Sequence, residues 1–595
     1  MTKHMRQEYP RPNLVRERWL SLNGEWSFGF DDANRGLREE WPSIIAQGDT
    51  SRLEQVINVP FAYQTPASGI NCQGYHPVVW YARGFEVPND WRGERVLLHF
   101  GAVDYEATVW VNGVVVGTHI GGYVPFSFDI TDVLRDDMNT ITVRVVDEDR
   151  IDQPRGKQTA TKERWGCWYT PVTGIWQSVW LEPVSATRFT DIFLKPDIDD
   201  ERLTIEYTLS ELQSDLVIEV MATDNGKLVA AQEVSVPDKI SRWLSAPLEW
   251  GVINLPVPAP HLWSPEHPHL YDLVVRLKSG DKTLDEIKTY FGMRKIHAER
   301  GQVYLNNRPY YQRLILDQGY WVEGLYTVTS IDELRKDVEL TKAMGFNGAR
   351  KHQKIEDPYF YYFCDKLGLL VWSEMPACYE YDVAGAERLR QEWTKAVLRD
   401  RNHPSIIAWV PINESWGVDQ LSHKVMPEAV AHLVSLYYQT KSIDPTRLVV
   451  SNDGWEHALT DMLTIHEYTQ DACDLRARYE IFKQNRHAKA FSHGRPTLLA
   501  EFDYDGAPIL VTEFGGVKVE EQQAEGWGYG KAAEDYGEMV QRITDLVDVI
   551  LDQNEVVGYC YTQLTDVQQE VNGLLDEYHN PKIDVELYKA AFRGK

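Results

Sequence analysis

The segment SIIAWVPINE (405–414) is an apolar run that ends in an acidic residue, and it decides the fold that the sequence predicts. Three further apolar runs carry an acidic residue at or next to their end: GLLVWSE (368–374), LLAEF (498–502) and PILVTEF (508–514). Helical patterns such as SIDELRKDVELTKAMG (330–345) alternate with these runs. Because alternating βα units over about 300 residues are typical of a parallel barrel, we predict a (β/α)8 barrel in the C-terminal half.

Two β-rich segments precede the barrel. In the first, EATVWVNGVVVGTH (106–119) places Asn112-Gly113 between alternating apolar runs, the strongest short signal for a hairpin. Further strand patterns there are VLLHF (96–100) and NTITVRVVDE (139–148). The second segment carries LTIEYTLS (203–210), DLVIEVMATDNGKLVAAQEV (215–234) and LYDLVVRLKSG (270–280). We predict three domains: an all-β sandwich over 1–185, an immunoglobulin-like β-sandwich over 186–295 and the barrel over 296–595.

Composition narrows the class of partner. The chain has 595 residues and a net charge of −28. The electrostatic field of such a charge repels nucleic acid and anionic lipid. Trp, Tyr and Phe make up 12% of the residues, and flat aromatic faces are what sugar rings pack against. We expect a neutral partner, with no nucleic acid and no membrane.

Cysteine usage and the N-terminal segment bear on the compartment. The six cysteines are scattered with no CxxC pair, which fits reduced thiols and argues against zinc clusters. The first 20 residues lack the apolar block of a secretory signal, and no apolar run approaches the roughly 20 residues of a membrane span. We expect a cytoplasmic protein.

Acidic residues at the ends of apolar strands are the candidates for chemistry, because the active site of a βα barrel lies at those ends. Three acids qualify, Glu374, Glu414 and Glu513. Two carboxylates that flank one glycosidic bond suffice for its hydrolysis. With about 30 residues per βα unit, Glu414 and Glu513 lie about three strands apart, across the barrel mouth. Glu374 is then a supporting acid.

Several ordered segments resemble glycoside hydrolase family 2, the family of β-galactosidases, β-glucuronidases and β-mannosidases, and the resemblance covers nearly the whole chain. In the β-rich half they are LNGEWSF (22–28), INVPFAYQT (57–65), GGYVPFSFDIT (121–131), YTPVTGIWQSVWLEP (169–183) and LWSPEHPHLYDL (262–273). In the barrel they are GFNGARKHQ (345–353), CDKLGLLVWSEMP (364–376), RDRNHPSIIAWVPINES (399–415), DMLTIHEY (461–468) and PILVTEFGG (508–516). The resemblance implies that the first sandwich is a jelly-roll sugar-binding domain.

The resemblance also implies a retaining double displacement. Glu414, which follows an Asn, is then the acid/base, and Glu513 of the TEFG segment is the nucleophile. Asn413 is expected to hold the sugar 2-hydroxyl. Arg350 and Tyr468 are expected to hydrogen-bond Glu513 and keep it ionised.

Other substrate-binding candidates are less specific. His352 and His466 occupy strand-end positions that line the sugar pocket in this family. Trp527 is either a sugar platform or a loop anchor, and Asp317 either binds sugar hydroxyls or is a solvated surface acid. We predict no cofactor, because no GxGxxG or HExxH motif is present. Some relatives use Mg2+ or Na+, but no dense acid cluster supports such a site here.

The last barrel loop, GYCYTQLTDVQQEVNGLLDEYHNPK (558–582), bears on substrate choice. β-Glucuronidases carry an Asn-x-Lys here, and the Lys pairs with the sugar carboxylate. In this chain Glu570-Val571-Asn572 takes that slot, so a uronic acid is expected to meet repulsion. The tryptophan that many relatives place at the end of this strand is replaced by Tyr561 or Gln563.

These departures leave several functions open. The leading one is a β-galactosidase-like exo-glycosidase for a neutral sugar, followed by a β-glucuronidase or β-galacturonidase and then by an α-L-arabinofuranosidase or β-galactofuranosidase. If a uronide binds, Lys354 and Arg313 are the first candidates for the cation. A non-catalytic carbohydrate-binding protein would be expected to lack Glu414, Asn413 or Glu513, and all three are present. We also expect a homo-oligomer.

Overall fold

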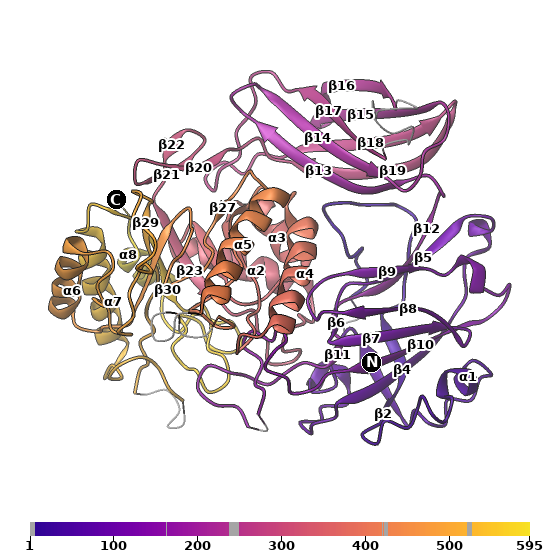
Figure 1. Ribbon diagram of the computed structural model, residues 1–595, viewed down its shortest axis with the longest axis horizontal. Helices are drawn as coiled ribbons and strands as arrows, with labels where there is room; N and C mark the ends of the chain where they lie inside the picture. Colours follow the sequence, from indigo (N-terminus) through magenta and orange to yellow (C-terminus); the bar gives the residue numbers. More distant parts are fainter. Residues whose placement is uncertain are drawn as a thin grey trace.

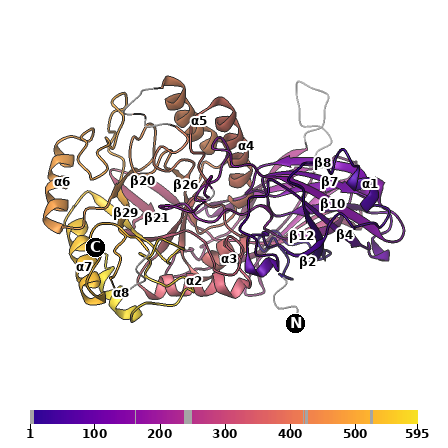
Figure 2. The same ribbon diagram turned by 90° about the horizontal axis from the view of Figure 1, so that it is seen from below.

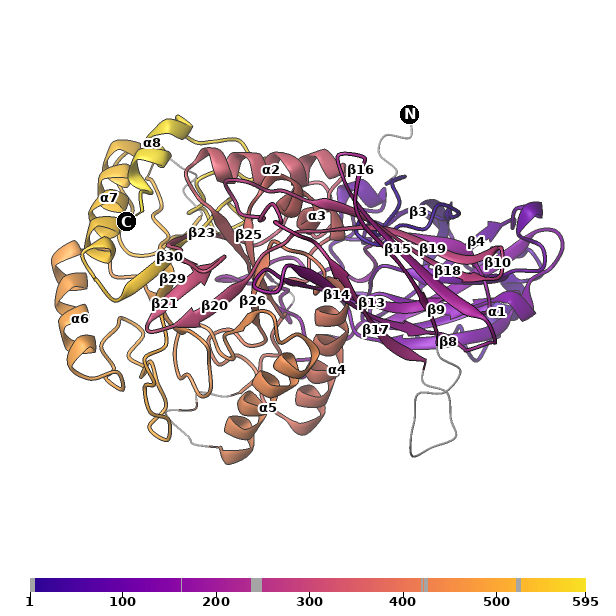
Figure 3. The same ribbon diagram turned by 90° about the horizontal axis from the view of Figure 1, so that it is seen from above.

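The computed structural model describes residues 6–161, 163–236, 249–418, 421, 426–520 and 526–594. It confirms the predicted fold class of two β-sandwiches followed by a barrel. In Figure 1 the barrel lies at the left, the second domain at the top right and the first domain at the lower right. The views from below and from above place the first domain beside the barrel as well (Figures 2 and 3).

The first domain packs two antiparallel sheets over one apolar core. One sheet has the order β1 (Leu20–Ser21), β12 (Val179–Val184), β5 (Arg95–Phe100), β9 (Phe126–Asp129). The other has the order β3 (Gln55–Val59), β2 (Gly24–Phe30), β4 (Val78–Phe85), β10 (Asn139–Val146), β7 (Glu106–Val111), β8 (Val114–Ile120). A short pair, β6 (Val103–Asp104) and β11 (Gly174–Ile175), and helix α1 (Trp41–Ile45) complete it. Asn112 and Gly113 form the predicted turn with φ of 53° and 82°.

The second domain is a smaller sandwich with its own core. Its three-stranded sheet has the order β13 (Phe189–Asp197), β14 (Arg202–Leu209), β17 (Trp250–Pro256). Its four-stranded sheet has the order β16 (Lys227–Ser235), β15 (Leu216–Asp224), β18 (Tyr271–Ser279), β19 (Lys282–Phe291). Residues alternate between partly exposed and buried along β14, which is why the sequence shows a period of two there.

The third domain is a sheet of eight parallel strands in the order β27-β26-β25-β24-β23-β30-β29-β28. The strands are β23 (Gln312–Asp317), β24 (Gly348–Lys351), β25 (Leu370–Glu374), β26 (Ile406–Val410), β27 (Leu448–Val449), β28 (Leu463–Glu467), β29 (Ile509–Gly515) and β30 (Val556–Thr562). The helices are α2 (Ile331–Ala343), α3 (Pro358–Leu367), α4 (Val383–Asp400), α5 (Pro427–Ile443), α6 (Ala472–Gln484), α7 (Tyr536–Leu551) and α8 (Val585–Ala591). Backbone hydrogen bonds from Asp461 N to Val449 O and from His466 N to Gly454 O join the segments around β27 and β28.

Two local features differ from an ideal alternation of strands and helices. The segment 450–462, between β27 and β28, contains no helix and forms an irregular loop at the mouth. The predicted strand 498–502 is wrong, because only Leu498 pairs there, in a single bridge to His457. Glu501 of that segment lies exposed on the surface, so its apolar neighbours belong to a loop.

The interior of the barrel changes character along its axis, and this change positions the site. At the end where the strands begin, the small sheet of β20 (Ile296–Glu299), β21 (Gln302–Leu305) and β22 (Arg308–Pro309) packs against inward-facing apolar residues such as Leu314 and Leu370. At the opposite end the inward-facing residues are charged, among them Arg350 and Glu374, both fully buried. Charged groups buried at the C-terminal ends of barrel strands mark this end as the candidate site.

Among the residues that the structure describes, no helix is both long and apolar enough to cross a bilayer. All six cysteines belong to the described part of the chain and are free thiols.

Candidate active site

Glu414 and Glu513 meet at the barrel mouth. One carboxylate oxygen of each lies within 4.8 Å of the other and of a His466 ring nitrogen. The Glu414 side chain is 19% exposed and the Glu513 side chain 6% exposed. The pair is therefore nearly shielded from water but open on the side of Glu414.

The loop after β26 holds Glu414 in an uncommon backbone conformation. Glu414 and Ser415 have φ of 54° and 60°, a region that non-glycine residues rarely occupy. The Glu414 N–H donates to the Asp453 carbonyl over 2.9 Å, and the Ser415 N–H donates to the Asn452 side chain over 2.9 Å. Strained backbone of this kind persists where neighbouring contacts fix it, commonly at functional sites. Here the loop between β27 and β28 supplies those contacts.

A bulge in β29 turns two consecutive side chains toward the mouth. Ile465 pairs with Val511, but the next residue, His466, pairs with Glu513, so Thr512 is the extra residue. The Thr512 hydroxyl donates to Asp453 over 2.8 Å. A strand without the bulge would direct one of these two residues away from the mouth.

Glu513 is held by three donors. Arg350 Nη1 donates to its Oε1 over 2.7 Å, and the Tyr468 hydroxyl donates to its Oε2 over 2.6 Å. His466 Nδ1 lies 3.4 Å from Oε2. Burial would raise the pKa of Glu513, but the charges of His466 and Arg350 hold it below its usual value. Glu513 is therefore ionised at neutral pH, as a nucleophile must be.

Arg350 is the centre of a buried charge network. Its Nε lies 2.8 Å from both Glu374 Oε2 and Asp453 Oδ2, and its Nη2 donates to Asn413 Oδ1 over 2.6 Å. Burial alone would lower the pKa of Arg350, but Asp453, Glu374 and Glu513 raise it well above its usual value. The guanidinium stays charged and fixes four acceptors around itself.

His466 bridges the two catalytic candidates. Its Nδ1 lies 2.7 Å from Glu414 Oε1, and its Nε2 lies 3.1 Å from Asp453 Oδ2. Burial would lower the pKa of His466, but the carboxylates of Glu513 and Asp453 raise it to about 10. The ring is therefore a cation that donates from both nitrogens. Glu414, His466 and Glu513 also place one ligand atom each close enough for a metal ion, but the proton on His466 competes with such an ion.

This charge state predicts a pH dependence. The pKa of His466 in the folded chain lies above that of an unfolded chain, about 6.5, so its stabilising effect is complete below that pH and is lost as pH rises toward about 10. We expect the thermal midpoint of the wild type to exceed that of His466→Gln at pH 6 and to lose this advantage by pH 10. A difference that stays constant across this range would show that the ring is neutral.

Glu374, His352 and Asn413 surround the Arg350 network and set its charge and its free donors. Burial raises the pKa of Glu374 to about 7, although Arg350 opposes the shift. His352 Nδ1 lies 2.9 Å from Glu374 Oε1 and 3.1 Å from Arg350 Nη2. Burial, together with the charges of Lys157 and Arg350, lowers the pKa of His352 well below its usual value, so its ring is neutral. Asn413 Nδ2 is buried and has no partner among the described residues, so it is a free donor for a substrate oxygen.

A loop of the first domain covers the barrel mouth. This mouth loop comprises residues 155–161 and 163–170. The N–H groups of Arg155 and Gly156 donate to the Ala377 carbonyl just beyond β25, over 2.9 and 3.1 Å. The Tyr169 hydroxyl donates to Glu570 beyond β30 over 2.6 Å. In Figure 1 purple chain from the first domain runs below the barrel beside yellow segments.

The mouth loop brings Lys157 to the catalytic residues. The Lys157 residue is only 8% exposed. Burial raises the pKa of the Cys167 thiol, and the charge of Lys157 opposes this shift. Burial would lower the pKa of Lys157, but Cys167, Glu414, Glu513 and Glu570 raise it above its usual value. A buried cation from a different domain therefore acts electrostatically on the three acids.

Both carboxyl oxygens of Glu570 accept hydrogen bonds from other residues of the protein. Its Oε2 accepts from Tyr169 and its Oε1 accepts from Asn572 Nδ2 over 3.1 Å. Burial raises the pKa of Glu570, opposed by Tyr169 and Lys157. Gln563 is fully buried, donates to Asn572 over 2.8 Å and accepts from Gln318 over 2.9 Å. Glu570 and Gln563 thus belong to one polar network beside the mouth.

The structure does not bring every predicted residue to the site. Tyr561 is a correction: it is fully buried on the outer face of β30, where its ring packs against Phe514 and Phe592. Cys560, one position earlier, faces the barrel interior, so the alternation of the strand turns Tyr561 away. Asp317 accepts from Lys351 Nζ over 2.8 Å and from the Gly319 N–H over 2.9 Å, which engages both of its oxygens.

The two cations predicted for a uronide are also engaged elsewhere. Lys354 donates to the carbonyls of Gly319 and Tyr326 over 2.7 and 2.9 Å. Arg313 Nε donates to the Gly345 carbonyl over 2.9 Å. Trp527 Nε1 donates to the Gly166 carbonyl over 2.8 Å, which makes it an anchor for the mouth loop.

Sequence reasoning missed Asp453 and Lys157. Asp453 follows a strand of only two residues, too short to stand out as an apolar run. An acid placed next to Asn and Gly after LVV was its only signal. Lys157 lies in the first domain, and nothing in its local sequence points to the barrel.

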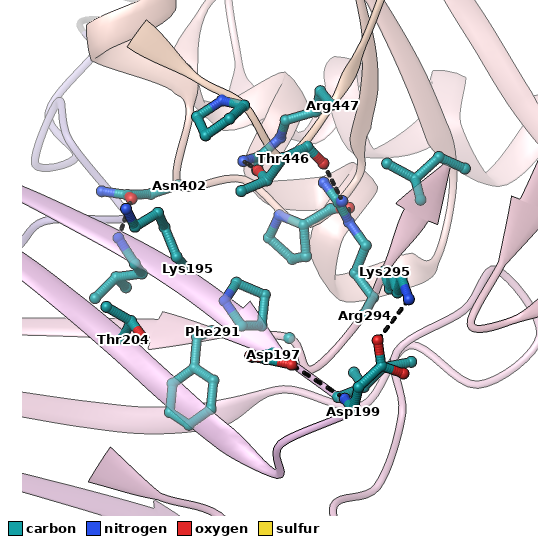
Figure 4. A pocket seen from close by; sticks show the side chains of 17 residues that line it. Lys195, Asp197, Asp199, Thr204, Phe291, Arg294, Lys295, Asn402, Thr446 and Arg447 are labelled. Carbon is teal, nitrogen blue, oxygen red and sulfur yellow. Dashed lines mark hydrogen bonds and ion pairs between the residues drawn. The ribbon is translucent and has the colours of Figure 1, made fainter. Parts of the chain in front are cut away.

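The cavity between the second domain and the barrel is a separate feature. It has a volume of about 400 Å³ and is lined by residues such as Lys195, Asp199, Arg294 and Arg447 (Figure 4). Arg294 donates to the Pro404 carbonyl over 2.8 Å, just before β26 begins. Because Glu414 follows the far end of β26, this cavity lies at the opposite end of the barrel from the catalytic candidates.

Comparison with known proteins gives a consistent picture. The chain matches, in order, the models for the glycosyl hydrolases family 2 sugar binding domain over residues 19–181, for glycosyl hydrolases family 2 over 187–294 and for the family 2 TIM barrel domain over 298–593. A β-galactosidase of Thermoanaerobacter pseudethanolicus is 29% identical over 424 residues, which are 69% of this chain and 54% of that protein. A β-glucuronidase of Paenibacillus borealis is 25% identical over 549 residues, 85% of this chain and 84% of that protein.

Solved structures agree in fold. The β-glucuronidase from Ruminococcus gnavus in complex with D-glucuronic acid superposes with a TM-score of 0.78 at 20% identity, covering 98% of this chain and 99% of that one. At this identity the likeness concerns the fold alone. The chain spans about half the length of some curated relatives that it matches, 54% and 50% in two of them.

Proposed function

Because the chain belongs to glycoside hydrolase family 2, we propose that it is a retaining exo-glycosidase with Glu414 as acid/base and Glu513 as nucleophile. The observation that carries this proposal is the approach of the two carboxylates to within 4.8 Å of each other. Retaining enzymes hold their carboxyl groups about 5–5.5 Å apart, whereas inverting enzymes need about 6.5–9.5 Å to admit a water molecule.

Each neighbour then has a role in the double displacement. Glu513, kept ionised by Arg350, attacks the anomeric carbon of the sugar. Glu414 protonates the leaving oxygen and later deprotonates the attacking water. Burial would raise the pKa of Glu414, but the hydrogen bond and the charge of His466, 2.7 Å away, hold it below its usual value. Glu414 is therefore ionised in the resting site and takes up a proton before the first step. Asn413 Nδ2, without a partner among the described residues, is the donor for the sugar 2-hydroxyl.

We propose a neutral, β-linked terminal sugar as the substrate, as in a β-galactosidase. The triplet Glu570-Val571-Asn572 takes the slot in which a β-glucuronidase carries Asn-x-Lys, so an amide replaces the carboxylate-binding Lys and an acid lies two residues before it. A β-galactosidase is among the relatives. The hydrogen bonds from Tyr169 and Asn572 hold the Glu570 carboxyl group in place. An acidic substituent brought against it would meet an acceptor, not a donor.

A uronide is the second candidate, and one observation favours it. Lys157 is a buried cation whose pKa is raised by the charges of Glu414, Glu513 and Glu570, so its own charge acts on the site and would favour a sugar carboxylate there. β-Glucuronidases are also among the relatives. The two candidates differ in what Lys157 does: it either balances the acids of the resting site or binds an acid of the substrate.

A panel of aryl glycosides separates these candidates. It comprises the β-galactoside, β-glucuronide, β-galacturonide, β-mannoside, α-L-arabinofuranoside and β-galactofuranoside, and kcat/KM is measured for each. We expect a neutral sugar to have the highest value. A uronide at the top of the panel would overturn the argument from Glu570.

Lys157→Met tests the second candidate directly. If Lys157 binds a sugar carboxylate, losing this charged contact lowers kcat/KM for uronides by about 10- to 100-fold relative to the neutral glycosides. If a neutral sugar is the substrate, the ratio of uronide to neutral activity stays constant. Lys531→Met, which replaces an exposed lysine, is the control and should alter neither kcat/KM value.

The cytoplasmic location and the homo-oligomeric state stay predictions.

A further inference from the structure

Three tryptophan rings form a continuous group beside the catalytic residues. The Trp168 ring meets the Trp416 ring edge-on, with centroids 5.4 Å apart and an interplanar angle of 89°. The Trp165 ring lies 4.3 Å from the Trp168 ring at 32°. We call Trp165, Trp168 and Trp416 the aromatic platform. Two of its members belong to the mouth loop and one belongs to the barrel.

The aromatic platform begins at the acid/base. Trp416 lies two residues after Glu414, at the end of the left-handed turn that Glu414 and Ser415 form. The Trp416 N–H donates to the Asn413 carbonyl over 3.0 Å, which closes this turn. A general acid must touch the oxygen that leaves, so the leaving group of the substrate departs on the Glu414 side. The aromatic platform therefore lies along the side on which the leaving group is bound.

The outer ring of the aromatic platform is exposed yet fixed. Trp165 is 55% exposed. The tip of its loop is held from the barrel, because Trp527 Nε1 and Gln569 Nε2 both donate to the Gly166 carbonyl, over 2.8 and 2.9 Å. Gln569 Nε2 also donates to the Trp168 carbonyl over 2.9 Å. Exposed aromatic surface that is held rigid is ready to bind a ligand without a further loss of conformational freedom.

The surface continues beyond Trp165 into a cleft. A cleft of about 1110 Å³ between the first domain and the barrel is lined by Glu163 and Arg164, which precede Trp165, and by Gln569. Its walls also carry aromatic rings, among them Tyr75, which is 50% exposed, and Trp321. A saccharide chain that leaves Glu414 across the aromatic platform would therefore run toward a polar and aromatic cleft.

From this arrangement we propose that Trp165 and Trp168, carried by the first domain, bind the leaving group of the substrate as a saccharide unit that stacks on their rings. The proposal rests on the proposed exo-glycosidase function and extends it to the second sugar. Sugar rings present flat C–H faces that pack on indole, and their hydroxyl groups can meet the polar residues of the cleft. The preferred natural substrate is then an oligosaccharide.

The test compares two substrates that share one terminal sugar, the sugar that ranks first in the panel. One is its glycosyl fluoride, whose leaving group is too small to reach the aromatic platform, and the other is its β-1,4-linked disaccharide with glucose. In Trp165→Ala we expect kcat/KM for the disaccharide to fall about 10-fold relative to kcat/KM for the fluoride, because stacked aromatic area is lost only for the disaccharide. Trp165→Phe, which keeps a flat ring, should restore most of this ratio.

Trp250→Ala is the matched control, because Trp250 is 48% exposed on β17 of the second domain, and it should leave the ratio unchanged. An unchanged ratio in Trp165→Ala, with both substrates turned over, would show that the aromatic platform does not bind the leaving group. The proposed exo-glycosidase function would still stand. A wild type that turns over neither substrate would contradict the proposed function and the aromatic platform together.

Discussion

Glu513→Gln is expected to lower kcat for an aryl glycoside by about 10⁴-fold or more, because the amide cannot form the glycosyl ester on which a double displacement depends. The substitution keeps the size of the side chain and its place beside Arg350 and Tyr468, so the loss reports on chemistry and not on folding. Initial rates and thermal midpoints of both proteins check this. A rate near that of the wild type would place the nucleophile elsewhere.

Glu414→Ala separates the two steps of the same reaction. With an activated leaving group, which needs no proton, the first step still proceeds and the glycosyl-enzyme accumulates on Glu513. Azide should then restore turnover and yield a product with the anomeric configuration of the substrate. Glu501→Gln is the control, since Glu501 lies exposed in an apolar segment that also resembles a strand end, and its rate should stay within about twofold of the wild type.

Arg350→Met should cost about 3–5 kcal/mol of unfolding free energy, because removing one partner of a buried ion pair leaves the others uncompensated. Glu374, Asp453 and Glu513 all lie within 2.8 Å of the guanidinium, and Arg350 is fully buried. Burial would then raise the pKa of each acid with no nearby guanidinium to oppose the shift. Denaturant unfolding followed by circular dichroism measures the loss.

Arg335→Met supplies the comparison for this variant. Arg335 pairs with Asp332 and Glu339 on the exposed face of α2, with 45% of its side chain exposed. Exposed pairs of this kind contribute about 0–1 kcal/mol. Similar losses in the two variants would mean that the charge network around Arg350 adds nothing beyond an ordinary surface pair.

The sequence predicts most of this architecture because the signals are local. The hairpin at Asn112-Gly113 follows from residues that tolerate positive φ. Glu414 and Glu513 stand out because each follows an apolar run, and the resemblance then distinguishes their roles from that of Glu374. Such features depend only on residues that are close together in the chain, so the sequence alone is enough to predict them.

The errors arise where the deciding contact lies far away in the chain. Tyr561 and Cys560 are both suited to a strand, and only the pairing with β23 and β29 decides which of them faces inward. The run LLAEF has strand composition, but β28 and β29, the strands before and after it in the chain, pair directly with each other. The charge of Lys157 acts on Glu414 only after two domains pack together, so no pattern within its own segment could indicate its place.

The mouth loop has a consequence for how this protein can change during evolution. The hydrolytic groups are encoded in the barrel, whereas Lys157 and Trp165 are encoded in a distant part of the gene. If Lys157 and Trp165 select the glycoside as proposed, mutations in that distant part alter which glycoside is accepted without changing Glu414 or Glu513. Recombination that exchanged the barrel alone would combine the catalytic residues of one protein with the mouth loop, and so with the substrate selectivity, of another. Lineages that inherit the mouth loop and the barrel together keep catalytic residues and selectivity residues that fit each other.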